Sequence, residues 1–208
     1  MSKAVSNVLR FVFVAVAGVL LTGCLLRRTT DSTRYFVLSP ISTNEPSAAQ
    51  TERFSVEIGF VKMPSYLLRN SIAVRNGDNE IQYLEDARWG ERLDQNFQRT
   101  LAANLSRLLP SDRVYPSDSG HDQVAVRVSV NVQQFDLDTR GCGTLIAHWR
   151  ILAADNDKPL KNGQARLVQS GALPRGHPEI IAKTLSDLTT EFSRELAKEI
   201  RESQSLSQ

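Results

Sequence analysis

The chain has 208 residues, of which 41% are hydrophobic and 23% are charged, proportions typical of an ordinary globular protein. Its 25 basic and 23 acidic residues leave a formal charge of +2. Two of the basic residues, Lys3 and Arg10, lie in a segment that is expected to be removed, so the mature chain is neutral. This balance excludes the basic footprint of DNA- and RNA-binding proteins, and no nucleic-acid partner is expected.

Residues 1–24 predict export and lipid attachment. After Lys3 and Arg10, residues 11–21 form an uncharged apolar run that is shorter than the roughly 20 residues a helix needs to cross a bilayer. The run closes on LTGC, which resembles the lipobox of bacterial lipoproteins and implies a signal peptide over residues 1–23 with acyl chains on Cys24. Such chains anchor a protein effectively permanently, because each buried CH₂ contributes about 0.8 kcal/mol. The alternative is an ordinary signal peptide that happens to contain a cysteine.

Cys142 is the second cysteine of the chain. With Cys24 acylated, no disulfide can form within the chain, even in an oxidising compartment. Cys142 lies between two glycines, and we expect it to be packed and inert. An intermolecular bridge or a reactive thiol is the alternative.

The mature chain is expected to have three parts: the lipidated Cys24 with a short tether to residue 33, a single domain over residues 34–200, and a flexible tail over residues 201–208. The domain begins with short runs of strand-forming residues. Pro64 ends the second of these, and the turn sequence NGDN separates the last two. The predicted strands are residues 34–38, 54–63, 71–75 and 80–84.

A helix is expected to follow, with Asp86 as its N-cap, Pro110 as its stop and an apolar stripe along one face. The stripe consists of Leu93, Phe97, Leu101, Leu105 and Leu108. Asp94, Asn104 and Gly90 also fall on this face. We expect the two polar side chains to reach backbone groups, since a buried polar group without a partner is costly, and the glycine to allow close backbone approach.

The second half predicts three strands and another helix. Valines at every second position from Val124 to Val132 are typical of a strand with one buried face, and residues 143–153 form an antiparallel partner. A further strand lies near residues 165–169. Pro178 starts a helix whose core contact ends near Glu199 and whose stripe is Ile181, Leu185, Leu188, Phe192 and Leu196. The predicted fold class is α/β, a two-layer sandwich with two amphipathic helices on one mixed or antiparallel sheet.

Nothing in the sequence points to catalysis. His121, His148 and His177 are far apart and lack the spacing of metal ligands, and no nucleophile elbow, phosphate-binding glycine loop or Cys-x-x-Cys pair is present. The polar run at residues 117–122 is what a turn between strands requires. We therefore expect no enzyme, no cofactor and no metal.

Several stretches, in a fixed order, resemble one family. They are YFVLSP soon after the lipobox, KMPSYLLRNSIAVR, RWGERLDQNFQRTLAANLSRLL, RVYP and LIAHWRIL, and together they are similar to the PqiC/YmbA-type auxiliary lipoproteins of ABC and MCE-type transport systems. The resemblance extends over residues 35–200. The positions that match the family pattern are Tyr35, Pro64, Tyr66, Leu67, Arg75, Trp89, Leu93, Leu101, Asn104, Leu105, Tyr115, Pro116 and Trp149.

The resemblance implies a subunit of an envelope lipid-transport system that docks a periplasm-spanning MCE-domain protein at the outer membrane. The implied location is the inner leaflet of the outer membrane, because Leu25 follows the acylated cysteine where inner-membrane retention is associated with aspartate. A homo-oligomer is expected. The segment Pro64–Arg75 is the candidate partner or lipid contact, through Pro64, Tyr66, Leu67 and Arg75, although tucking of Tyr66 and Leu67 under the sheet is the alternative.

Two other functions remain open from the sequence. A lipoprotein of this size can scaffold or activate a cell-wall enzyme, which usually involves a longer tether. A periplasmic lipid carrier would instead need an apolar groove between the helices and the sheet.

Overall fold

The structure, a computed structural model, describes residues 32–42, 54–111, 113–117, 124–172, 174 and 176–205. Cys24, the tether up to residue 31 and His121 lie outside these residues. From Thr33 onward the chain forms one compact unit. Its elements in chain order are β1 (Arg34–Phe36), β2 (Val56–Ile58), a 3₁₀ turn η1 (Ser65–Leu68), β3 (Ser71–Asn76), β4 (Glu80–Trp89), α2 (Leu93–Leu108), β5 (Val114–Pro116), β6 (Val126–Asp138), β7 (Cys142–Ala153), β8 (Pro159–Ser170) and α3 (Pro178–Ser205).

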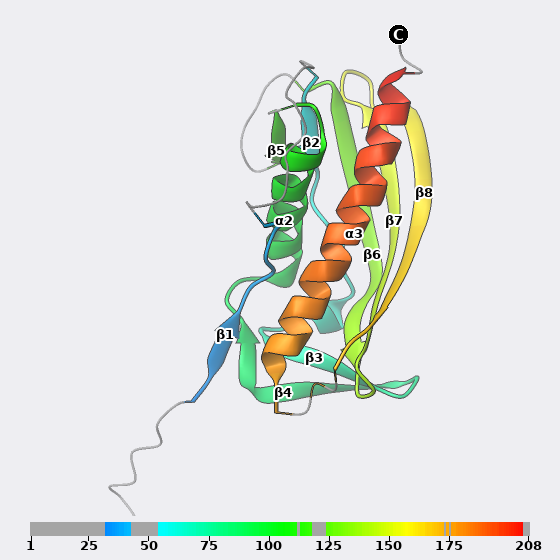
Figure 1. The fold of residues 1–208 in the computed structure, drawn as a ribbon. Coiled ribbons are helices and arrows are strands. Elements are labelled where there is room, and N and C mark those ends of the chain that lie inside the picture. The colour runs from blue at the N-terminus through cyan, green and yellow to red at the C-terminus, as the bar shows by residue number, and fades with distance from the viewer. Residues whose placement is uncertain are drawn as a thin grey trace, which may run out of the picture. The chain divides into compact units, whose positions relative to one another are not determined.

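The eight described strands form one open, mixed sheet organised around β6. Along one side, β6 pairs antiparallel with β7, which pairs antiparallel with β8. On its other side, β6 pairs in parallel with β2 near its start and with β3 near its end. β5 extends the sheet from β2, while β4 and then β1 extend it from β3. The long strand thereby connects two smaller groups of strands (Figure 1).

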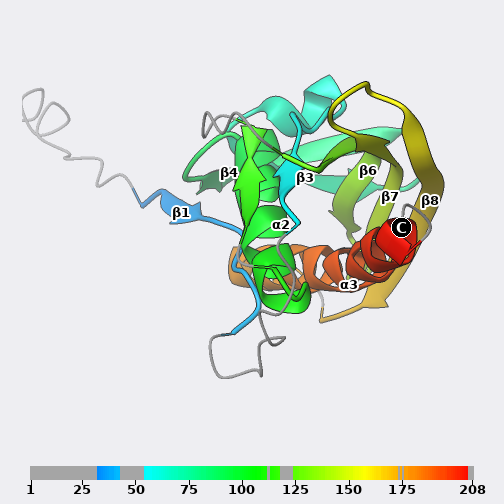
Figure 2. The same cartoon turned by 90° about the horizontal axis from the view of Figure 1, so that it is seen from above.

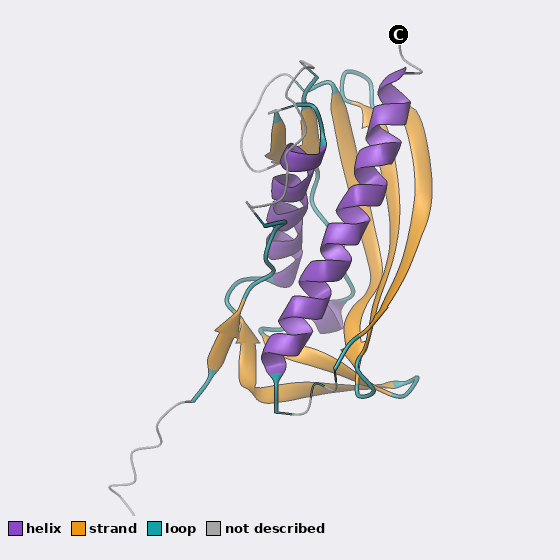
Figure 3. Cartoon of the chain, in the orientation of Figure 1, coloured by secondary structure: helices purple, strands orange, loops and turns teal. Residues whose placement is uncertain are grey.

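Both helices lie side by side against the same face of the sheet (Figures 2 and 3). The predicted two-layer α/β sandwich is confirmed, because one helical layer covers one face of one mixed sheet. No helix in the described part of the chain has both the length and the apolar content needed to cross a membrane.

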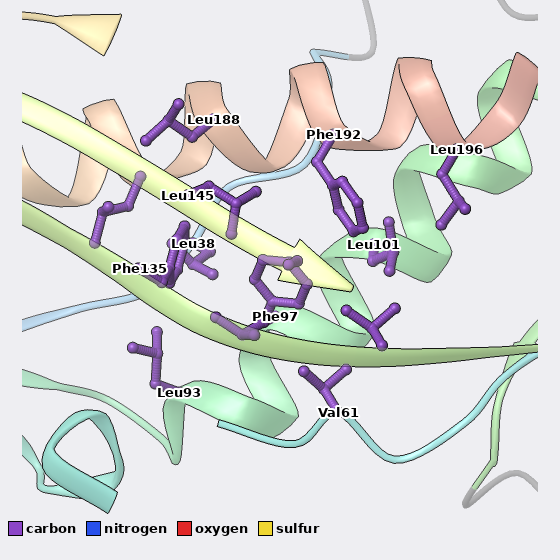
Figure 4. Close-up of a cluster of buried hydrophobic side chains, with 14 of the residues drawn as sticks. Leu38, Val61, Leu93, Phe97, Leu101, Phe135, Leu145, Leu188, Phe192 and Leu196 are labelled. Atoms are coloured by element: carbon purple, nitrogen blue, oxygen red, sulfur yellow. The ribbon is translucent and has the colours of Figure 1, made fainter. Parts of the chain in front are cut away.

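The core lies between the helices and the sheet (Figure 4). Phe97 of α2 occupies its centre, with its ring centroid 5.2 Å from that of Phe135 in an edge-to-face arrangement and 6.1 Å from that of Phe192 of α3. All three rings are completely buried. Burial of a side chain of this size contributes about 1.5–3 kcal/mol, so the helix stripes and the strand ladder stabilise one another.

The valine ladder is confirmed from Val126 to Val132, where every second side chain is buried. Val124 precedes the strand and is half-buried. A bulge between Val132 and Gln134 then shifts the register of β6 against β7. At the bulge, two residues of β6 lie opposite one residue of β7. The extra residue shifts the alternation of faces, so Phe135 faces the helices and the buried face continues to the end of the strand.

The predicted start of the first helix was wrong. Asp86 does not cap a helix but lies in β4, which continues to Trp89, and α2 begins at Leu93. The last residues of β4 pair with β1, and Ala87 and Trp89 are buried while Arg88 between them is exposed. This alternation is that of a strand with one buried face, so sheet pairing decides the conformation.

Other boundaries also differ from those expected: β1 ends at Phe36, and β8 begins at Pro159. The strand predicted at residues 54–63 is regular only over β2, although Lys62 still exchanges backbone hydrogen bonds with β6 at Val130 and Val132. In α3 the core contact continues past Glu199, because Ile200 is fully buried and the helix reaches Ser205. Residues 201–205, expected in a flexible tail, are therefore helical.

Candidate functional site

The chain between β1 and the first gap, residues 37–42, is held between the helices by side chains; we call it the docked segment. The amide of Leu38 donates to Oδ1 of Asn96 at 2.5 Å, and the amide of Ile41 donates to Oδ1 of Asn104 at 2.7 Å. Leu38 and Ile41 are buried. These backbone groups are outside the sheet, and the two asparagines of α2 take the place of a neighbouring strand.

α3 completes this arrangement. Oγ of Ser186 accepts a hydrogen bond from the amide of Ser39 at 3.0 Å, and Nδ2 of Asn104 donates to Oγ of Ser193 at 3.0 Å. Asn104 is fully buried and bonds both the docked segment and α3, as expected of a polar residue on the apolar face. The sequence analysis missed Asn96, although its spacing of eight residues from Asn104 places both on one helix face.

Asp94, by contrast, is not in the interior. It forms an ion pair with Arg92 at 2.7 Å at the start of α2. Partial burial raises the pKa of Asp94, but hydrogen bonds and charge from Arg92, together with first-turn amides, outweigh this and leave the pKa lowered. Gly90 lies before the helix, where its amide donates to the carbonyl of Phe36 at 2.8 Å, so the expected close approach is to β1.

A hollow of about 590 Å³ lies between the docked segment and α3. On one side it is lined by Tyr35 and Val37, two residues that are 65% and 52% exposed. On the other it is lined by polar positions of α3, including Lys183 and Asp187, which are paired with each other at 2.6 Å. Exposed apolar side chains beside polar ones are the usual composition of a protein contact surface.

A second cluster surrounds Asp136, whose side chain is only 1% exposed. Oδ1 and Oδ2 of Asp136 accept hydrogen bonds from Nε and Nη2 of Arg75 at 3.1 and 2.7 Å, and Oδ2 also accepts one from the hydroxyl of Tyr66 at 2.7 Å. Gln134 donates to Oδ1 at 2.9 Å. Burial and the hydrogen bond to Asp136 raise the pKa of Tyr66, and the hydrogen bond to Asp136 raises the pKa of Arg75. The buried carboxylate is thereby satisfied.

The four candidate contact residues occupy one region of the fold. Leu67 is in the core at 3% exposure, as the tucked alternative supposed, and Pro64 is half-buried just before η1. Tyr66 and Arg75 are both bound to Asp136, a residue that the sequence analysis did not identify. Asp136 sits among outward-facing positions of a strand, and no periodicity marks it. A contact role for these residues stays a prediction.

Most positions of the family pattern build the core. Trp89, Leu93, Leu101, Leu105 and Trp149 are buried, whereas Tyr35 is exposed. Tyr115 and Pro116 are half-buried in β5.

Among the described residues, no group of three or more histidine, cysteine, aspartate or glutamate side chains is placed to hold a metal ion. His148 is exposed on β7. His177 lies beside Glu179 at the start of α3, with its Nδ1 3.0 Å from Oε1. Cys142 is a half-buried thiol at the start of β7.

Comparison with known proteins identifies a family and several relatives that match this chain. Residues 36–197 match the family model of the ABC-type transport auxiliary lipoprotein component. The intermembrane transport lipoproteins PqiC of Escherichia coli K12 and Shigella flexneri are each 27% identical over 117 residues, which is 56% of this chain and 62% of each relative. The chain thus matches about three fifths of the length of these relatives.

Two crystal structures share the fold. Protein XCC0632 of Xanthomonas campestris superposes with a TM-score of 0.69 at 12% identity, over 84% of this chain and 98% of that one. An uncharacterized protein superposes with a TM-score of 0.62 at 22% identity, over 81% and 98%. At these identities the likeness concerns the fold alone. The family match covers most of the described domain, and PqiC is a homologue of this chain. The predicted resemblance is confirmed: this chain belongs to the family of ABC-type transport auxiliary lipoproteins.

Proposed function

We propose that this protein is a membrane-anchored subunit of an MCE/ABC-type envelope lipid-transport system that docks the periplasm-spanning MCE-domain protein at the outer membrane. The family match over residues 36–197 is the observation that carries the proposal. The protein works without catalysis, and the energy for transport comes from its partners.

The connection between anchor and fold supports this role. Between Cys24 and Arg34 the chain spans at most about 35 Å when fully extended. β1 begins at Arg34, which is tied to Glu179 at the start of α3 by an ion pair of 2.9 Å. The docked segment that follows β1 is hydrogen-bonded to both helices, α2 through Asn96 and Asn104 and α3 through Ser186. Acylation of Cys24 therefore confines the whole domain to a thin layer at the membrane and raises its effective concentration for a partner that reaches this layer.

The surface beside the docked segment is the proposed docking surface. Tyr35 and Val37 are exposed apolar side chains at the point where the domain leaves its tether. The Pro64–Arg75 segment, in the other candidate contact region, contributes a second contact through the exposed parts of Tyr66 and Arg75. Assembly as a homo-oligomer would repeat these surfaces around one partner.

The lipid-carrier alternative loses support from the packing. The valine ladder from Val126 to Val132 and the helix stripes would line an acyl groove. They belong to one buried cluster, against which the partly buried Leu108 packs. The helix stripes and the valine ladder pack against one another and bury the apolar surface that a lipid carrier would leave open for an acyl chain.

The test is a crosslinking pull-down of the full lipoprotein from its native envelope, with Cys24→Ala and Tyr35→Ser/Val37→Ser variants. Recovery of an MCE-domain protein by the anchored wild type, with reduced recovery by both variants, is the expected result. Gln164→Ser, an exposed polar change on β8, serves as the matched control. Recovery of a peptidoglycan synthase instead would assign the protein to cell-wall assembly and contradict the proposal.

A further inference from the structure

The face of the sheet opposite the helices carries polar side chains in its middle, most of which are exposed. Strand register aligns Ser129 of β6 with Arg150 of β7 and Asn162 of β8. The next row on this face aligns Asn131 with His148. Because side chains alternate between faces, these residues point away from the buried valine ladder.

A hollow of about 310 Å³ lies over these two rows. Lys62, bridged to Asn131 through the backbone, joins it from the loop after β2. The described residues that line it are Lys62, Ser129, Asn131, His148, Trp149, Arg150, Asn162 and Gly163, and none of them is acidic. The lining therefore supplies two permanent positive charges and several hydrogen-bond donors, a combination that suits an oxyanion.

A neighbouring arginine on this face is paired with carboxylates, in contrast to Arg150. Arg127 lies on the same face and is compensated by Glu57 at 3.2 Å and Asp157 at 2.7 Å. Arg150 has no carboxylate within ion-pair distance among the described residues, and Lys62 likewise has none. An uncompensated arginine and lysine in one hollow raise the local positive potential, which attracts an anion.

An exposed aromatic ring lies next to this hollow. Phe60 is 75% exposed and lines a second, adjoining hollow of about 600 Å³. The two hollows share Ser129 and Arg150, and the carboxylates of the adjoining hollow, Glu57 and Asp157, are both paired with Arg127. A free phosphate ion gains nothing from contact with an apolar ring. A ligand with an apolar portion beside its phosphate can contact both the ring of Phe60 and the basic residues of the first hollow.

We propose that this hollow binds the phosphate of an anionic phospholipid headgroup. Arg150 and Lys62 bind the phosphate oxygens, and His148 with Asn131 and Asn162 donates further hydrogen bonds. Phe60 packs against the glycerol and first acyl carbons. This site is separate from the proposed docking surface, and its test requires no partner protein.

The test measures binding of short-chain dihexanoyl phosphatidylglycerol, below its micellar concentration, to the mature lipoprotein in a non-ionic detergent. Native mass spectrometry counts the bound molecules, and a titration gives the dissociation constant. Dihexanoyl phosphatidylcholine and inorganic phosphate are the comparison probes. The variants are Arg150→Gln, Lys62→Gln and Phe60→Ser. The matched control is Arg166→Gln, which changes an exposed arginine of β8 that lines neither hollow.

Wild type should bind phosphatidylglycerol more tightly than either comparison probe. Arg150→Gln should weaken this binding about tenfold, the effect of losing one charge-assisted interaction, and Arg166→Gln should change it less than twofold. Equal binding by Arg150→Gln and wild type, with both folded by circular dichroism, would overturn the site. Phosphate binding as tight as phosphatidylglycerol binding, with no effect of Phe60→Ser, would overturn the lipid assignment. Neither result bears on recovery of an MCE-domain protein.

Discussion

Arg75 and Asp136 form a two-point ion pair, with Nε to Oδ1 at 3.1 Å and Nη2 to Oδ2 at 2.7 Å, although they are 61 positions apart in the chain. The carboxylate is buried and the guanidinium is 23% exposed. The pair connects β3 to the last part of β6, where the two strands also pair through their backbones.

Replacing Arg75 with alanine should lower the free energy of unfolding by about 3 kcal/mol, because it leaves Asp136 charged and buried with only neutral donors. Urea unfolding measures the change. Lys183→Ala, which removes an exposed pair with Asp187 on α3, should cost less than about 0.5 kcal/mol. The double variant Arg75→Ala/Asp136→Ala should lose less than the sum of the single changes. A loss below about 1 kcal/mol in Arg75→Ala would show that water already screens the pair.

Asn104→Ala should loosen the docked segment specifically. The change leaves the amide of Ile41 without its acceptor and the hydroxyl of Ser193 without its donor, at a cost of about 2 kcal/mol. Relative to the wild type, the variant should show a larger increase in the hydrogen-exchange rate at the amide of Ile41 than at the amides of β6. Gln95→Ala, an exposed change on the same helix, is the control. Unchanged exchange at Ile41 would mean that burial of its side chain alone holds the segment.

The carboxyl group of Glu179 should titrate near pH 2. A backbone hydrogen bond at its own amide, then His177 and Arg34, lower the pKa of Glu179 from its ordinary 4.5 to about 2. Because the folded pKa is depressed, the stabilisation is present above about pH 4.5 and is lost as the pH falls toward 2. Carbon-13 NMR of the carboxyl group gives the midpoint. His177→Gln should raise it, and a midpoint near 4.5 in the wild type would contradict these contacts.

Gly163→Ala should destabilise the sheet through Trp149. A Cβ at position 163 would lie 2.5 Å from Cζ2 of the Trp149 ring, which is packed across the strand pair β7–β8 at 7% exposure. A rigid ring cannot give way without moving its neighbours, and we expect a loss of about 1–3 kcal/mol. Thermal unfolding and tryptophan fluorescence measure the effect, with Gln164→Ala as the control. Recovery of stability by Trp149→Phe in the same chain would identify the ring as the cause.

The stripes of both helices and the valine ladder could be predicted because the spacing of apolar residues reports which face of an element is buried, whatever it packs against. The same local logic located Asn104 as a buried polar group in need of partners. It failed at Asp86, where a residue typical of helix starts lies in a strand. The pairing of β4 with β1, 53 positions apart at Arg34 and Ala87, overrode this local preference.

The sequence by itself determined the fold class and the family, because each depends on composition, periodicity or ordered motifs, and lipid attachment at Cys24 stays a prediction from a short motif. Only the tertiary structure decided that Tyr66 and Arg75 meet at Asp136, and that residues 37–42 lie between the helices. It also decided that Lys62, His148 and Arg150 share one hollow without a carboxylate. These relationships join Tyr66 to Asp136 across 70 positions, Leu38 to Asn96 across 58, and Lys62 to His148 across 86. Local spacing carries no information about them, since they arise only when separate strands and helices pack into one sheet and one core.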